Sequence, residues 1–272
     1  MKALVPLPAA TVTLVRDTTL GLEVLMLQRN FQSGFMPGMY MFPGGALDPG
    51  DQVPEAYAIC GGLDDATASR VLGIAHGGLA YWIAAIREAF EEAGILLACD
   101  AHGKVLALDD PQAKERFRAH RHALNAGECD FLEIARTERL RLAVDALVYF
   151  SHWITPVGAP RRYDTRFFVA RTPAGQEPLH DNVEAINHAW VRPEAALAAH
   201  ARGEFSMRTP TAKTLETFAR YAQVDDLLAA MRALHDIPPI LPRVTKDGRR
   251  VLPGEPGYEE AVDAGSMGRW EI

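Results

Sequence analysis

The eight residues from Arg87 to Gly94, which read REAFEEAG, decide how this sequence is interpreted. Glu88, Glu91 and Glu92 fall within about one helical turn, where like charges repel by a few tenths of a kcal/mol per pair. One explanation is a solvated acidic helix face, partly neutralised by the arginine four residues before Glu91. The other is a divalent metal site, because hard cations such as Mg2+ take oxygen ligands. The eight residues alone leave both explanations open.

The surrounding residues predict a helix from about Leu79 to Leu97 with one apolar side. That side gathers Ile83, Ile86, Phe90, Gly94 and Leu97. The three glutamates fall on the other side of the helix. A helix packed along its apolar side would hold these carboxylates rigidly, as a metal site requires.

Composition and charge exclude several classes of protein. The 272 residues are 48% hydrophobic and 23% charged, with a formal net charge of −7, which are values typical of globular chains. No Lys/Arg block is long enough to follow a phosphate backbone, so we expect no nucleic-acid polymer as partner. No apolar run reaches the roughly 18 to 20 residues that cross a bilayer, and we expect no membrane association.

The cysteines and the N-terminal residues predict a cytoplasmic location. The three cysteines are widely spaced and form no Cys-x-x-Cys pair, which favours a reducing compartment. Residues 1–17 alternate as a strand would and contain two prolines, so we expect no signal peptide. The last four residues, RWEI, match no peroxisomal address.

The order of the predicted elements favours an α/β fold. Strands are expected in the β-branched and aromatic runs at 9–16, 22–29, 146–156, 162–170 and 185–192. Helices are expected at 109–127, 129–142, 193–203, 209–223 and 225–235. Strands on both sides of the helical segments indicate a mixed sheet between helices. We assign residues 1–235 to one domain, with one short helix in 52–78, and the Pro/Gly-rich residues 236–272 to an extended C-terminal extension.

A glycine-rich stretch precedes the acidic helix. Residues 42–51, FPGGALDPGD, place paired glycines directly after a short predicted strand, where the backbone can approach a ligand closely. Combined with REAFEEAG, this stretch resembles the signature of the Nudix hydrolases. In that signature a Gly and, six positions later, a Glu precede the segment Arg-Glu-x-x-Glu-Glu-x-Gly. Gly45 and Asp51 match the first pair, and residues 87–94 match the segment.

Three departures from the signature matter. Asp51 replaces Glu, Ala89 is a small aliphatic residue, and 35 residues separate Asp51 from Arg87, where the signature has seven. The extra length of about 28 residues, within 52–78, falls in a loop, where added length changes stability little. The acyl-coenzyme A diphosphatase branch of the family has such an insertion, and the chain resembles that branch over about residues 10 to 222, for example in GFMPGMYMFPGGALD and RRYDTRFFVA.

The resemblance implies a Nudix-type α/β/α sandwich and assigns roles to the motif residues. The groups that would hold Mg2+ or Mn2+ are Glu88, Glu91, Glu92 and the carbonyl of Gly45. Arg87 would orient a glutamate through a bidentate ion pair. Gly44 and Gly45 would form the loop that shapes the site against the substrate.

The remaining candidate residues each have two interpretations. Glu184 is a candidate for the general base. The alternatives are that one of the helix glutamates is the base, and that Glu184 is an ordinary exposed carboxylate at the start of a strand. Asp164 and Arg166 share a strand face, so they would reach substrate phosphates or pair with each other. Arg161 would contact the same phosphates or position a loop, and Arg29 would bind substrate or cap the acidic site.

The resemblance implies a small nucleotide-type substrate. The first hypothesis is hydrolysis of coenzyme A or acyl-coenzyme A to 3′,5′-ADP and (acyl-)4′-phosphopantetheine. A second keeps the chemistry but changes the substrate to ADP-ribose, NADH or another nucleoside diphosphate derivative. A third is a nucleotide-sensing module without turnover, although such a module would have no need for all three glutamates. The assembly state is left open and includes a homodimer.

Overall fold

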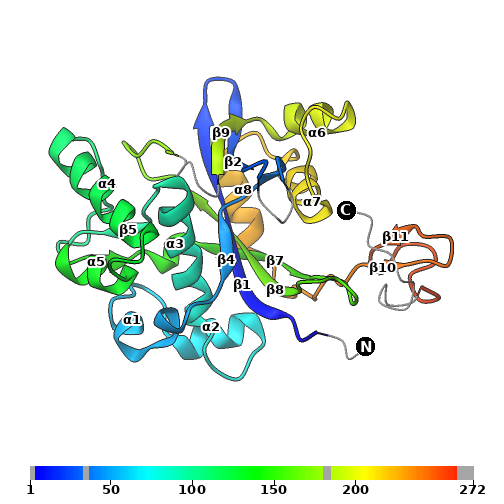
Figure 1. Cartoon of the computed structure of the whole chain (residues 1–272), viewed down its shortest axis with the longest axis horizontal. Helices are drawn as coiled ribbons and strands as arrows, with labels where there is room; N and C mark the ends of the chain where they lie inside the picture. The colour runs from blue at the N-terminus through cyan, green and yellow to red at the C-terminus, as the bar shows by residue number, and fades with distance from the viewer. Residues whose placement is uncertain (1–3, 33–36, 180–184, 262–272) are drawn as a thin grey trace.

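A seven-stranded mixed β-sheet lies between two layers of helices (Figure 1). The computed structural model describes residues 4–32, 37–179 and 185–261. The strand order is β3-β2-β1-β8-β7, while β4 pairs with β1 and β9 pairs with β2. These strands are β1 (Leu7–Thr18), β2 (Gly21–Arg29), β3 (Tyr40–Met41), β4 (Gly44–Ala46), β7 (Val148–Ile154), β8 (Tyr163–Arg171) and β9 (Ala185–Val191). The predicted α/β/α sandwich is confirmed.

The predicted N-terminal hairpin forms between β1 and β2, which are antiparallel from Val15 opposite Val24 to Thr18 opposite Gly21. Side chains alternate across β2, because successive residues of a strand point to opposite faces. Leu25 and Leu27 enter the core beneath α3. Val24 and Met26 enter the core on the other face. The alternation therefore gives the sheet two apolar faces, each of which needs a helical layer.

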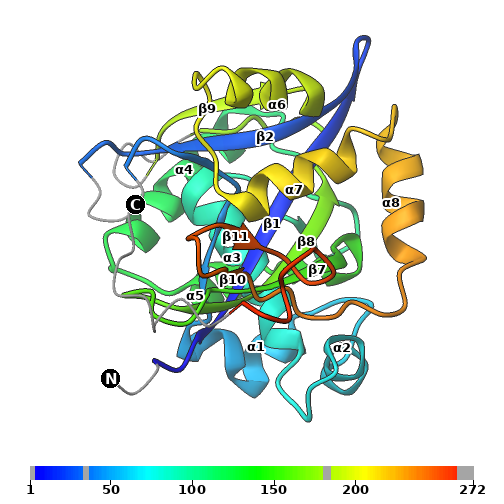
Figure 2. The same ribbon diagram turned by 90° about the vertical axis from the view of Figure 1, so that its right-hand side faces the viewer.

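The two helical layers come from different parts of the chain. One face is covered by α1 (Pro54–Ala58), α2 (Asp65–Leu72), α3 (Leu79–Ala93), α4 (Pro111–Asn125) and α5 (Phe131–Thr137). The other is covered by α6 (Pro193–Ala201), α7 (Thr209–Phe218) and α8 (Val224–Arg232). Figure 2 shows α7 in front of the sheet and α3 behind it.

Helix α3 is shorter than the sequence predicts. It ends at Ala93, because Gly94 adopts a left-handed conformation with φ of 68° and donates its N–H to the carbonyls of Ala89 and Phe90. Such a glycine cap ends many helices. The apolar residues after it continue to a short strand, β5 (Ala98–Cys99), which pairs with β6 (Arg141–Leu142).

The insertion contains more regular structure than the one short helix predicted for it. A 3-10 turn, η1 (Pro49–Gln52), leads into α1, and α2 follows after six residues. The side chain of Asp64 caps α2 by accepting the N–H of Thr67, and Gly73 closes its other end with φ of 67°. The insertion is therefore a folded part of the α3 layer.

The C-terminal extension begins as an addition to the sheet. Ile240 forms a parallel bridge with Trp153 on β7, and its N–H donates to the carbonyl of His152 over 2.8 Å. A small hairpin of β10 (Arg243–Val244) and β11 (Arg250–Val251) follows. This pairing is more regular than the extended segment predicted. None of the helices within the described ranges is long and apolar enough to cross a membrane.

Candidate active site on helix α3

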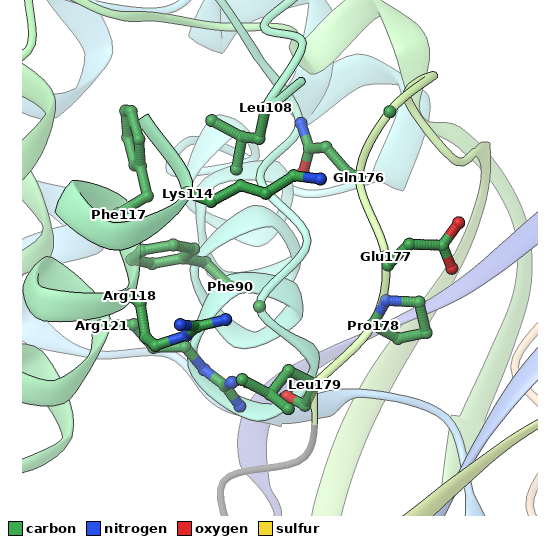
Figure 3. A pocket seen from close by; sticks show the side chains of 12 residues that line it. Phe90, Leu108, Lys114, Phe117, Arg118, Arg121, Gln176, Glu177, Pro178 and Leu179 are labelled. Carbon is green, nitrogen blue, oxygen red and sulfur yellow. Dashed lines mark hydrogen bonds between the residues drawn. The ribbon is translucent and has the colours of Figure 1, made fainter. Parts of the chain in front are cut away.

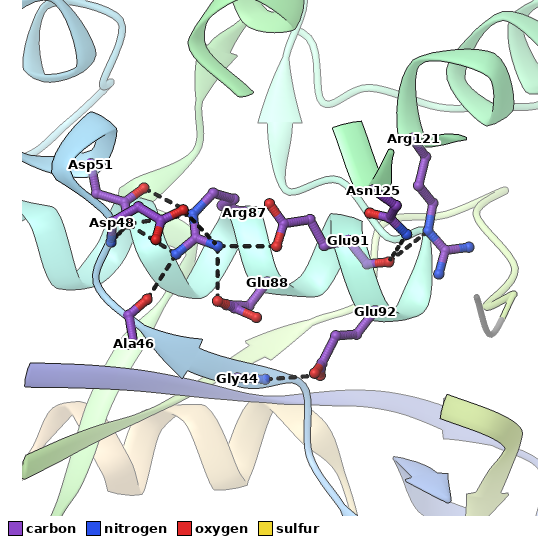
Figure 4. A network of polar contacts seen from close by, with 10 residues as sticks. All are labelled: Gly44, Ala46, Asp48, Asp51, Arg87, Glu88, Glu91, Glu92, Arg121 and Asn125. Carbon is purple, nitrogen blue, oxygen red and sulfur yellow. Dashed lines mark hydrogen bonds and ion pairs between the residues drawn. The ribbon is translucent and has the colours of Figure 1, made fainter. Parts of the chain in front are cut away.

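The acidic side of α3 packs against β4 (Figure 4). The side chains of Glu88 and Glu92 point toward this strand, and the two residues are only 8% and 4% exposed. The N–H of Gly44 donates to Oε2 of Glu92 over 3.1 Å. The acidic face is therefore buried against a glycine strand, and the solvated-face explanation is wrong for these two glutamates.

The glycines of β4 allow this close approach. A Cβ atom on Gly45 would lie 2.4 Å from Oε1 of Glu88. A Cβ atom on Gly44 would lie 2.5 Å from Oγ1 of Thr11 and 2.6 Å from the carbonyl of Ala10. Each glycine thus faces a different neighbour, Gly45 the glutamate on α3 and Gly44 the adjacent strand β1, with which β4 pairs.

Arg87 holds the carboxylates around it in one network (Figure 4). Its Nε and Nη2 donate to the two carboxylate oxygens of Asp51, over 3.1 and 3.0 Å. Its Nη1 donates to Glu88 Oε1 over 2.8 Å and to Glu91 Oε2 over 3.0 Å, and Nη2 also donates to the carbonyl of Ala46 over 2.9 Å. One guanidinium therefore fixes two of the three glutamates and ties the start of the insertion to α3.

Burial and charge shift the ionisation of this network. Burial by itself would lower the pKa of Arg87, but the hydrogen bond and charge of Asp51 and the charges of Glu88 and Glu91 raise it above its usual value. Arg87 therefore stays cationic. Burial raises the pKa of Glu91, against the opposing effect of Arg87.

Comparisons with known proteins place the chain in one family. A family model for the NUDT19 Nudix domain matches residues 69–217, which is more than half of the chain. This chain belongs to the Nudix hydrolase family. The acyl-coenzyme A diphosphatase NUDT19 of Homo sapiens is 30% identical to it over 282 residues, which cover 89% of this chain and 74% of that protein. The protein of the same name from Xenopus laevis is 28% identical and covers 91% of this chain and 74% of its own.

A solved structure supports the same fold. The crystal structure of a Nudix hydrolase from Alicyclobacillus acidocaldarius superposes with a TM-score of 0.65 at 26% identity, covering 86% of this chain and 99% of that one. The segment Arg87 to Gly94 lies within the range that the family model matches. We refer to α3 as the Nudix helix from here on.

Nudix hydrolases in general use a divalent cation, and the residues here fit one. Within the described ranges, no three His, Cys, Asp or Glu side chains already form a metal cluster. The donors present on β4 and the Nudix helix are nevertheless oxygens, which Mg2+ and Mn2+ accept. Glu88 and Glu92 both face β4, where a Cβ on Gly45 would overlap the Glu88 carboxylate. Glu91 points away from β4, but Nη1 of Arg87 binds both Glu91 and Glu88 and so joins these two carboxylates.

Asp164 and Arg166 pair with each other, which is the second of their two interpretations. Arg166 Nη1 forms an ion pair with Asp164 Oδ1, and His152 Nε2 lies 2.6 Å from the same oxygen. Arg166 is 4% exposed and its guanidinium lies 5.5 Å from the ring of Tyr81. The trio therefore lies beneath the first turn of the Nudix helix, two turns before Glu88.

Two other predicted residues, Arg161 and Arg29, lie at or next to the ends of strands. Arg161 is exposed in the turn before β8. Arg29 ends β2, where its Nε donates to Sδ of Met41 over 3.3 Å. Glu184 lies outside the described residues. The substrate contacts proposed for these three residues stay predictions.

Sequence reasoning missed two residues that support the Nudix helix. Arg121 Nε and Asn125 Nδ2, both on α4, donate to the backbone carbonyl of Glu91 over 2.9 and 3.2 Å. Arg121 is 6% exposed. Its spacing from Ala113 and Phe117 places it in the buried stripe of α4, and a cation within an apolar stripe was the available signal.

Among the residues that the structure describes, two of the cavities border the Nudix helix. We name the first, of about 540 Å3, the insertion pocket; its walls are Asp48, Pro49, Gly50, Asp51, Val53, Ala56, Ile59, Ile83, Arg87, Glu91, Leu124, Cys129, Asp130, Phe131, Leu132 and Leu142. The second, of about 260 Å3, lies at the C-terminal end of the helix (Figure 3). Its charged lining residues are Lys114, Arg118, Arg121 and Glu177.

Proposed function

We propose that this Nudix hydrolase cleaves the pyrophosphate bond of coenzyme A or acyl-coenzyme A, with Mg2+ or Mn2+, to 3′,5′-ADP and (acyl-)4′-phosphopantetheine. The observation that carries the chemistry is the packing of Glu88 and Glu92 against Gly44 and Gly45. The relatives named acyl-coenzyme A diphosphatase, at 28% and 30% identity over about nine tenths of the chain, support the substrate class.

The cation would be held by Glu88 and Glu92 with the Gly45 carbonyl, and Glu91 would complete the set from the edge of the helix. When bound, such a cation neutralises phosphate charge and lowers the pKa of a coordinated water. Arg87 fixes the orientation of Glu88 and Glu91 through Nη1. A fixed carboxylate needs no reorganisation during the reaction, which is the protein's main contribution to such catalysis.

Product analysis tests this proposal. The purified chain is incubated with Mg2+ or Mn2+ and, separately, coenzyme A, an acyl-coenzyme A, ADP-ribose, NADH and a nucleoside triphosphate, and products are identified by mass spectrometry. We expect 3′,5′-ADP and a phosphopantetheine, and in water enriched in 18O we expect one labelled oxygen in one of the two products. The Glu92→Gln variant, prepared in parallel, controls for a contaminating hydrolase.

The other results would each change the assignment. AMP released from ADP-ribose or NADH alone would retain the chemistry and replace the substrate. No product with any substrate and either metal would favour a nucleotide-sensing module. The expected cytoplasmic location and the homodimer stay predictions, which cell fractionation and light scattering would test.

A further inference from the structure

We propose that the insertion pocket binds the acyl chain of an acyl-coenzyme A substrate, so that the insertion dividing the Nudix motif sets acyl-chain preference. This inference rests on the proposed function. It is carried by the position of the pocket, because the side chains of Arg87 and Glu91 line it and also belong to the Nudix network. An occupant of the pocket therefore lies directly beside the catalytic helix.

The walls of the insertion pocket select an apolar occupant. Val53, Ala56 and Ile59 come from the insertion. Ile83 of the Nudix helix and Leu124, Phe131 and Leu132 of the α4–α5 segment face them across the pocket. A volume of about 540 Å3 lies within the range of roughly 300 to 1,000 Å3 typical of ligand sites, which are mostly apolar.

The charges around the pocket disfavour an anionic occupant. Its lining includes the carboxylates of Asp48, Asp51, Glu91 and Asp130. Among the residues that line the pocket, Arg87 carries the one positive charge, and its guanidinium already binds Asp51 and Glu91. Glu91 would share the bound cation, and the other three carboxylates would repel the phosphates of a nucleotide from this pocket. The acyl chain is the part of such a substrate that is both uncharged and apolar, so the charges and the apolar walls select the same occupant.

Chain-length kinetics provide the first test. For the parent protein we expect kcat/KM to rise about fourfold per added methylene until the pocket is full, since one buried methylene contributes about 0.8 kcal/mol. Leu132→Trp and Val53→Phe fill the pocket at half-buried positions. Both variants should lose this dependence and retain kcat/KM for free coenzyme A.

Val71→Trp is the matched control for these variants. Val71 belongs to α2 of the same insertion but is 51% exposed, and the substitution adds bulk outside the pocket. This control should keep the chain-length dependence of the parent. Thermal unfolding shows whether each variant is folded, and Leu132→Ala adds a second measurement, because an enlarged pocket should move the preferred chain length upward.

Cysteine labelling tests the pocket without turnover. Cys129 is half-buried and lines the pocket, whereas Cys99 is half-buried and lies outside both cavities. Burial raises the pKa of both thiols, so both react slowly with iodoacetamide at about pH 8.5. Mass spectrometry measures the rate at which each is alkylated. In EDTA, dodecanoyl-coenzyme A should slow alkylation of Cys129 at least fivefold and leave Cys99 unchanged, and free coenzyme A should protect neither.

The two tests separate failure of the pocket from failure of the proposed function. Hydrolysis of all acyl-coenzyme A species with equal kcat/KM, together with unprotected Cys129, would overturn the pocket and leave the function in place. Absence of any hydrolysis would overturn the function, and the labelling would still decide whether the pocket binds an acyl chain. Equal protection of Cys99 and Cys129 would overturn the pocket as well, because it would report a general change in the protein.

Discussion

Replacing Gly45 with Ala is expected to remove most catalytic activity and leave the fold intact. The new Cβ atom would lie 2.4 Å from Oε1 and 2.9 Å from Oε2 of Glu88, whereas ordinary contacts begin at 3.4 Å. The Glu88 carboxylate must therefore move by about 1 Å, a displacement that typically lowers the rate about 100-fold. Because the clash falls on the end of a side chain, the strand itself can stay in place.

Two other glycines serve as controls. A Cβ on Gly44 would meet backbone, 2.6 Å from the Ala10 carbonyl and 2.8 Å from Thr11 Cα, so Gly44→Ala should lower the unfolding temperature as well as activity. A Cβ on Gly61 would make only ordinary contacts, of 3.6 Å and longer, and Gly61→Ala should resemble the parent. The assay is kcat at saturating Mg2+ and substrate, with thermal unfolding of every variant.

A second substitution distinguishes displacement of Glu88 from other effects of the methyl group. In the double variant Gly45→Ala/Glu88→Asp the carboxylate is one methylene shorter and no longer meets the new Cβ. We expect the double variant to be no less active than Gly45→Ala alone. A Gly45→Ala protein that is folded and keeps kcat within threefold of the parent would refute the reasoning, because the position of Glu88 would then not matter.

Three further predictions concern the same network and its surroundings. Glu92→Gln should lower kcat by orders of magnitude with an unchanged fold, and full activity at saturating Mg2+ would contradict its role as a ligand. Arg87→Lys loses the bidentate pair with Asp51 and should lower the free energy of unfolding by about 3 kcal/mol in urea titrations. Burial alone would raise the pKa of Asp164, but the hydrogen bond from His152 and a neighbouring guanidinium hold it below its usual value. Its ionised form therefore stabilises the fold above the unfolded-state pKa of about 3.9, and this contribution is lost as the pH falls through the folded pKa. Asp164→Asn should consequently destabilise the protein more at pH 7 than at pH 3, and an equal effect at both values would disprove this.

Local patterns in the sequence were sufficient for the elements that carry the motif. The β-branched and apolar residues at 22–29, next to a glycine-containing turn, predict β2, because this composition is a local signal that depends on nothing distant. The 3.6-residue pattern predicts the Nudix helix from local sequence as well. It extends past the true end at Ala93 because Gly94 and Leu97 continue the apolar side of the helix. The paired glycines predicted close approach to a ligand, and the structure shows the close neighbour to be Glu88.

Contacts between distant segments could not be predicted in the same way. The carbonyl of Glu91 accepts hydrogen bonds from residues 30 and 34 positions later, and nothing in either segment specifies the other. The pairing of His152 with Asp164 depends on the β7–β8 register, which shifts between Tyr149 and Ser151. A one-residue shift of register moves side chains to the other face. The burial of Glu88 and Glu92 likewise depends on where β4 lies.

A side chain of the insertion caps the N-terminal end of the Nudix helix. Gly78, the residue before the Nudix helix, has no side chain to cap it, and Asp65 of α2 instead accepts the N–H groups of Gly77 and Leu79, each over 3.0 Å. Its neighbour Asp64 caps α2 itself. Loss of such a cap costs about 1 kcal/mol, so Asp65→Ala and Asp64→Ala should destabilise the protein similarly. Only Asp65→Ala should accelerate amide hydrogen exchange at the start of the Nudix helix, and equal acceleration in both variants would show that the insertion does not cap it. Arg87 on the Nudix helix binds Asp51, the residue just before the insertion. Asp65, within the insertion, caps the start of the same helix. Side chains therefore connect the Nudix helix both to the insertion and to the part of the motif that precedes it.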